Sequence, residues 1–72
     1  MLNDTETLSY YTANGLKLMS RIEDAIGNGK MFHEMHPDLE QEFWTAADSR
    51  NARALMRIYN QLAKLTDEVE SA

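Results

Sequence analysis

The chain contains no cysteine, only one proline and only three glycines among its 72 residues. Without cysteine it can have neither thiol chemistry nor the disulfide framework that small secreted domains usually need. No apolar run approaches the length needed to cross a bilayer, and Asp4 and Glu6 stand where a signal peptide would be positively charged. We therefore expect a soluble, cytoplasmic protein.

Basic residues are also few, because seven Lys and Arg oppose twelve Asp and Glu, for a net charge of −5. A protein that binds DNA by itself normally shows a basic patch, and none is visible here. We expect direct DNA binding to be weak or absent. The charge suits a basic protein partner, although an acidic balance can also serve solubility alone.

Features of an enzyme are missing as well. A chain this short has little room to enclose a small-molecule pocket. No Ser-His-Asp arrangement and no phosphate-binding glycine loop can be assembled, so we expect neither catalysis nor a cofactor. His33 and His36 lie near Glu34 and Asp38 but without a recognisable ligand spacing, so no metal site is expected; the alternative is a pH-sensitive loop.

The pattern of the remaining residues is helical, with no β-type alternation and no internal repeat. We predict an all-α fold, a single small domain over 1–72 with three to four helices, the C-terminal one long. The approximate helices are 5–13, 16–27 and 37–65, followed by a frayed acidic tail at 66–72. Asn14-Gly15 would separate the first two, Gly27-Asn28-Gly29 would end the second, and Pro37 would open the third.

Apolar spacing predicts which side chains are buried. The first helix would bury Leu8, Tyr11 and Tyr10, and the second Leu16, Met19, Ile22 and Ile26. Met31, Phe32 and Met35 would fold back over the core. The third helix would use Leu39, Phe43, Ala46 or Ala47, Leu55, Ile58, Leu62, Leu65 and Val69.

The third predicted helix contains the most informative stretch, Phe43-Trp44-Thr45-Ala46-Ala47-Asp48-Ser49-Arg50. From Leu55 onward the apolar spacing alternates three and four, as in a coiled-coil seam. Extended backward, the same seam meets Asn51, Asp48 and Trp44, which a simple core would not place there. A break near Asp48–Arg50 is the alternative to one continuous helix.

The position of Asp48 allows two interpretations. It can be a cap or a surface ion pair within the fold, or it can be a recognition carboxylate beside Trp44 on a partner-binding face. Arg50, Arg53 and Arg57 lie at i, i+3 and i+7, either as a solvated basic stripe or as a contact to phosphate or an acidic partner.

The same eight residues resemble the motif Phe-Tyr-Ser-Ala-Ala-Asp-His-Arg of the Hha/YmoA family, small bacterial haemolysin-expression-modulating proteins. Ala52 and Met56 continue the similarity, and Ile22-Glu23-Asp24-Ala25-Ile26 followed by Lys30 resembles the second helix of that family. The resemblance covers roughly residues 20–58. The basic region of the family's first two helices is diluted here by Gly15, Leu18 and Gly29, and the family's C-terminal Pro and Trp segment is missing.

The resemblance implies an all-helical, non-enzymatic protein that binds the N-terminal domain of the nucleoid protein H-NS and modulates gene silencing. It implies that Asp48 contacts arginine on H-NS and that Glu23 is a second acidic position on the same face. The candidate partner-binding residues are therefore Asp48, Glu23, Trp44 and Arg50, and the protein would be nucleoid-associated through its partner. The competing hypothesis is a small adaptor or inhibitor, of mobile-element origin, that binds another host protein and dimerises through Leu55-Ile58-Leu62-Leu65.

Overall fold

The computed structural model describes residues 3–72, which form four α-helices and no strand. These are α1 (Asp4–Ile26), α2 (Phe32–Met35), α3 (Pro37–Asp48) and α4 (Ala52–Ser71). The predicted fold class, a small all-α domain with one long C-terminal helix, is confirmed.

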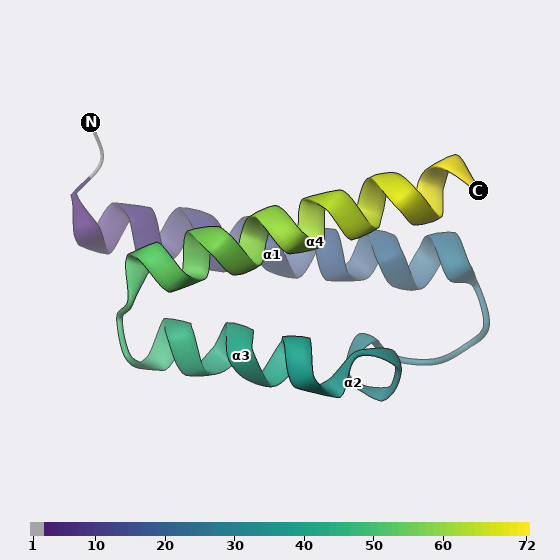
Figure 1. Ribbon diagram of the computed structural model, residues 1–72, viewed down its shortest axis with the longest axis horizontal. Helices are drawn as coiled ribbons and strands as arrows, with labels where there is room; N and C mark the ends of the chain where they lie inside the picture. Colours follow the sequence, from purple (N-terminus) through teal and green to yellow (C-terminus); the bar gives the residue numbers. More distant parts are fainter. Residues whose placement is uncertain (1–2) are drawn as a thin grey trace.

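The two long helices, α1 and α4, pack side by side and run in the same direction (Figure 1). Tyr11 meets Tyr59 with ring centroids 5.0 Å apart, and Arg21 meets Glu70 further along both helices. α3 runs antiparallel to this pair, and the short α2 turns the chain at the end where α1 finishes. The layout is a three-helix bundle with one corner at each end.

The predicted boundary at Asn14-Gly15 is wrong, because α1 continues through it without interruption. Gly15 is buried in the middle of this helix, where a Cβ atom would overlap the ring of Phe43. The amide of Asn14 donates to the carbonyl of Tyr10 at 2.8 Å, one turn back in the same helix. Glycine is therefore needed here to leave room for the ring of Phe43 against α1, and not for a turn.

Continuity of α1 also changes which residues it buries. Positions 8, 11, 15, 18 and 22 alternate by three and four along one face. That register turns Leu16, Tyr10 and Ile26 outward, against the prediction, and brings Leu18 inward. In the connector Phe32 is fully buried as predicted, whereas Met31 is exposed. The core consists of Leu8, Leu18, Met19, Ile22, Phe32, Phe43, Ala46, Leu55, Ile58 and Leu62.

The predicted third helix is two helices, separated at residues 49–51. The predicted acidic tail at 66–72 is also wrong, because α4 remains helical to Ser71. Thr66 is 1 % exposed, and its hydroxyl donates to the carbonyl of Leu62 at 2.7 Å, so burial leaves no polar atom unpaired. Glu70 accepts two hydrogen bonds from Arg21. The last turns therefore belong to the packed domain.

The apolar seam on α4 is buried against the other helices of the same chain. Leu55 and Leu62 are completely buried, Ile58 is 5 % exposed, and Leu65 packs against the same core. A homodimer through these residues would require the bundle to open, so this predicted dimer surface is wrong. Within residues 3–72, no helix combines the length and the apolar character that a membrane span requires.

Candidate interaction site at the α3–α4 corner

The stretch singled out in the sequence forms the corner between α3 and α4. Two backbone hydrogen bonds close the corner, one from the N–H of Asn51 to the carbonyl of Ala46 at 2.9 Å and one from the N–H of Arg50 to the carbonyl of Ala47 at 3.1 Å. This pair is the Schellman arrangement that closes many helix ends. Asn51 then caps the next helix, since its side chain accepts from the N–H of Ala54 at 3.1 Å. One residue thus ends α3 and starts α4.

Arg50 occupies the left-handed position of this corner, with φ of 55°. Glycine or asparagine usually fills that position, because a Cβ atom there costs about 1 kcal/mol. The guanidinium of Arg50 donates to the hydroxyl of Thr5 at 3.0 Å, which ties the corner to the first turn of α1. Arg50 therefore has a role within the fold, and it lies outside α4 and its basic stripe.

Asp48 is the last residue of α3, and it is exposed. A carboxylate at a helix C-terminus faces the negative end of the helix dipole, and the last turn of α3 contains no basic residue to offset it. Within residues 3–72 Asp48 forms no salt bridge and accepts no side-chain hydrogen bond. The fold gives this charge no stabilising partner, and the seam that sequence periodicity extended to it stops at the corner.

Trp44 lies one turn before Asp48 on the exposed side of α3. Its side chain is 40 % exposed, although its neighbour Phe43 is fully buried and meets it edge to face with centroids 5.2 Å apart. Residues at i and i+4 are neighbours on a helix surface. Trp44 and Asp48 therefore present an aromatic ring and a free carboxylate side by side.

Glu23 is not part of this site. It lies near the other end of α1, and its carboxylate accepts a hydrogen bond from the backbone N–H of Phe32 at 2.6 Å. The hydrogen bond from Arg50 of the corner to Thr5 lies at the opposite, N-terminal end of α1. The expectation that Glu23 is a second acidic position on the same face as Asp48 is wrong, because Glu23 is half-buried and holds the connector before α2 in place.

The histidines of the connector serve other contacts. The ring of His36 lies against Phe32, with centroids 5.2 Å apart, and Nδ1 of His33 is 3.9 Å from a carboxylate oxygen of Glu40. In the part of the chain that the structure describes, no three His, Asp or Glu side chains gather in a way that could hold a metal ion.

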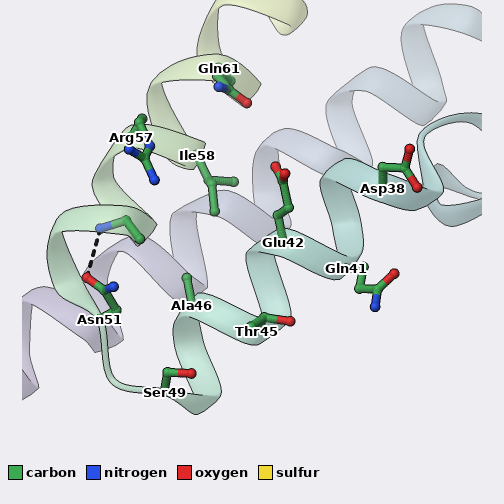
Figure 2. A pocket seen from close by; sticks show the side chains of 11 residues that line it. Asp38, Gln41, Glu42, Thr45, Ala46, Ser49, Asn51, Arg57, Ile58 and Gln61 are labelled. Atoms are coloured by element: carbon green, nitrogen blue, oxygen red, sulfur yellow. Dashed lines mark hydrogen bonds between the residues drawn. The ribbon is translucent and has the colours of Figure 1, made fainter.

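One feature was not predicted from the sequence, an open groove of about 650 Å³ between α3 and α4 (Figure 2). Its floor contains the small or apolar side chains of Ala46, Ala54 and Ile58. Asp38 and Glu42 line it from α3, and Arg57 and Gln61 line it from α4. Only after the break at 49–51 is recognised do the spacings of α3 and α4 place these residues along one groove.

The pKa of Arg21 is raised above its usual value by its hydrogen bonds to the carboxylate of Glu70 and by the attraction between the two charges. This pair joins the C-terminal halves of α1 and α4, far from the corner. Arg21 stays charged at physiological pH, and because both side chains are exposed the pair adds only modestly to the stability of this end of the bundle.

Comparison of the chain with protein-family models, with curated proteins and with solved structures finds no match. The resemblance to the Hha/YmoA family therefore rests on the residues quoted above, and the function must be argued from the corner itself.

Proposed function

We propose that this protein is a non-enzymatic modulator of gene expression that binds a nucleoid-associated silencer of the H-NS type. The contact is centred on Asp48 and Trp44, with Arg50 at its edge. The observation that carries the proposal is the exposed carboxylate of Asp48, which sits at an unfavourable helix end without an ionic partner in the described chain.

The chemistry of the corner defines the partner surface. A free carboxylate beside a half-exposed indole fits a Lys or Arg side chain that can pair with Asp48 while its apolar stem or a neighbouring residue covers the ring. Trp and charged groups together are typical of interface hot spots. The resemblance supplies a candidate for that cation, an arginine in the N-terminal domain of H-NS.

The net charge of −5 agrees with a role through another protein, because it would oppose an approach to DNA. Charge complementarity at such an interface chiefly sets the association rate and the choice of partner. Binding should therefore weaken as salt rises, since the attraction between the approaching charges is screened over about 8 Å at physiological ionic strength.

The test is the substitution Asp48→Asn, measured by titration calorimetry against the N-terminal domain of an H-NS-type protein. We expect about 30-fold weaker binding or more, which corresponds to the loss of one well-desolvated charge pair. The variant should melt at the same temperature as the parent or slightly higher, because a charge that opposes the helix dipole has been removed.

The matched control is Asp24→Asn, which removes another exposed carboxylate, from the last turn of α1. It should bind at full strength. Full-strength binding by Asp48→Asn, or equal weakening by both variants, would remove Asp48 from the contact. Failure of the parent protein to bind any H-NS-type domain would remove the proposed partner.

A further inference from the structure

The two sides of the groove between α3 and α4 carry opposite charges. Asp38 and Glu42 lie one turn apart on the α3 side, and Arg57 lies on the α4 side, as Figure 2 shows. Lys64 follows Arg57 by seven residues, which is two turns along the same side of α4. None of these four exposed side chains forms an ion pair within residues 3–72.

The acidic and basic residues are matched in height along the groove. Asp38 is ten residues before the end of α3 at Asp48, and Lys64 is twelve residues after the start of α4 at Ala52, so at 1.5 Å per residue they lie about 15 Å and about 18 Å from the corner. Glu42 lies about 9 Å and Arg57 about 8 Å from the same helix ends, so each pair differs by less than one helical turn. The two sides therefore carry opposite charges at corresponding levels.

We propose that this groove is the surface through which two copies of the chain associate. A two-fold axis parallel to the helices and running along the groove places α3 of each copy over α4 of the other. That rotation preserves the height of every residue, so Glu42 faces Arg57 of the second copy and Asp38 faces its Lys64. The surface is complementary to itself, as an isologous interface requires.

Other arrangements lose this complementarity. A two-fold axis perpendicular to the helices in the plane of the face would set acid against acid and base against base, which is destabilising. The small side chains of Ala46 and Ala54 on the floor of the groove permit close approach of a second helix pair.

Because each copy offers only two helix faces about three turns long, the buried area lies at the low end for specific interfaces. The dimer is therefore weak, and its formation depends on concentration.

The inference is independent of the proposed function. Trp44 and Asp48 do not line the groove, so a dimer keeps two recognition corners accessible. Two linked sites would engage an oligomeric partner with higher avidity than one site can.

The experiment is sedimentation equilibrium of the purified full chain at low salt, from micromolar to millimolar concentration. The parent should pass from monomer to dimer within this range. Glu42→Arg and Arg57→Glu should each remain monomeric, because each sets like charges against one another in both halves of the interface. Asp24→Arg, an equal charge reversal outside the groove, should associate like the parent.

The decisive measurement uses an equimolar mixture of Glu42→Arg and Arg57→Glu. In the mixed dimer one copy presents arginine at both positions and the other presents glutamate at both, so every contact is again between opposite charges. Recovery of the dimer in the mixture supports the two-fold geometry. A parent that stays monomeric throughout, single variants that dimerise like the parent, or a mixture that stays monomeric would each overturn the proposal, whatever the outcome for H-NS binding.

Discussion

Arg50 combines an unfavourable backbone conformation with a side-chain contact to another helix. Its backbone adopts the left-handed conformation, and its side chain reaches Thr5 on another helix. The exposed hydrogen bond returns little stability in water, because the same groups are solvated when apart. A residue that keeps an unfavourable backbone for a small gain in stability is a reasonable member of a binding surface.

We predict opposite effects for two substitutions at this position. Arg50→Gly removes the side chain but also removes the left-handed penalty of about 1 kcal/mol, so its melting temperature should equal or exceed that of the parent. Arg50→Ala keeps the penalty and loses the bond to Thr5, so it should melt lower than either. Circular dichroism melts of the two variants, with Thr5→Ala to isolate the lost bond, check the order.

The relative melting temperatures of these variants also test whether Arg50 belongs to the candidate site. If Arg50→Gly is as stable as the parent and still binds the silencer domain fully, the guanidinium is not a partner contact. If alanine is the more stable of the two, the left-handed assignment at the corner is wrong.

At the scale of elements, the contact between α1 and α3 depends on the absence of a side chain at Gly15. Alanine within a helix is normally more stable than glycine by about 1 kcal/mol. Here the added methyl group would overlap the ring of Phe43, which is fully buried. Overpacking of this kind costs about 1–3 kcal/mol.

We therefore predict that Gly15→Ala lowers the melting temperature, with a net loss of about 1 kcal/mol, or roughly 4–8 °C for a domain of this size. Ser20→Ala, on the exposed side of α1, is the control and should raise it slightly. A rise for Gly15→Ala would mean that the Phe43 ring gives way freely and that α3 is loosely attached.

Sequence patterns predicted the helical class, the Gly27 stop, the Pro37 start and most of the α4 seam, because each depends on local backbone preferences or on a regular period. They failed at Gly15 because glycine has two uses, and only the position of Phe43, 28 residues later, decides between turn and close contact. They also carried the α4 period backward through Asn51, where a helix corner resets the phase.

The candidate site was predicted in part for the same reason. Trp44 and Asp48 are four residues apart on one helix, so their proximity follows from spacing alone. Glu23 was grouped with them by resemblance, whereas its position depends on the path of the connector to Phe32. The groove depends on two helices that meet only after the corner, so no single-helix pattern could reveal it.

At the scale of the whole molecule, the C-terminal turns of α4 decide whether the bundle closes at its far end. Thr66 is buried there, Val69 packs against the core, and Glu70 is held by Arg21. We predict that a chain ending at Leu65 loses at least 5–10 °C in melting temperature, since it exposes the end of α1 as well as shortening α4.

A chain lacking only Ser71 and Ala72 is the control for this truncation, and it should melt like the parent because both residues are exposed. Equal melting of the longer truncation and the parent would restore the view of residues 66–72 as a frayed tail.

The parallel packing of α1 against α4 sets the order in which the protein can be made and folded. Arg21 and Glu70, which join the two helices, are 49 residues apart in a chain of 72. The apolar face of α1 is synthesised well before its main partner, α4. Because helix contacts this distant in sequence raise the contact order, the domain should fold more slowly than a hairpin-connected bundle of the same size. During synthesis Leu18 and Ile22 therefore wait for α4 to cover them, and the bundle closes only when the last turns of α4 are available.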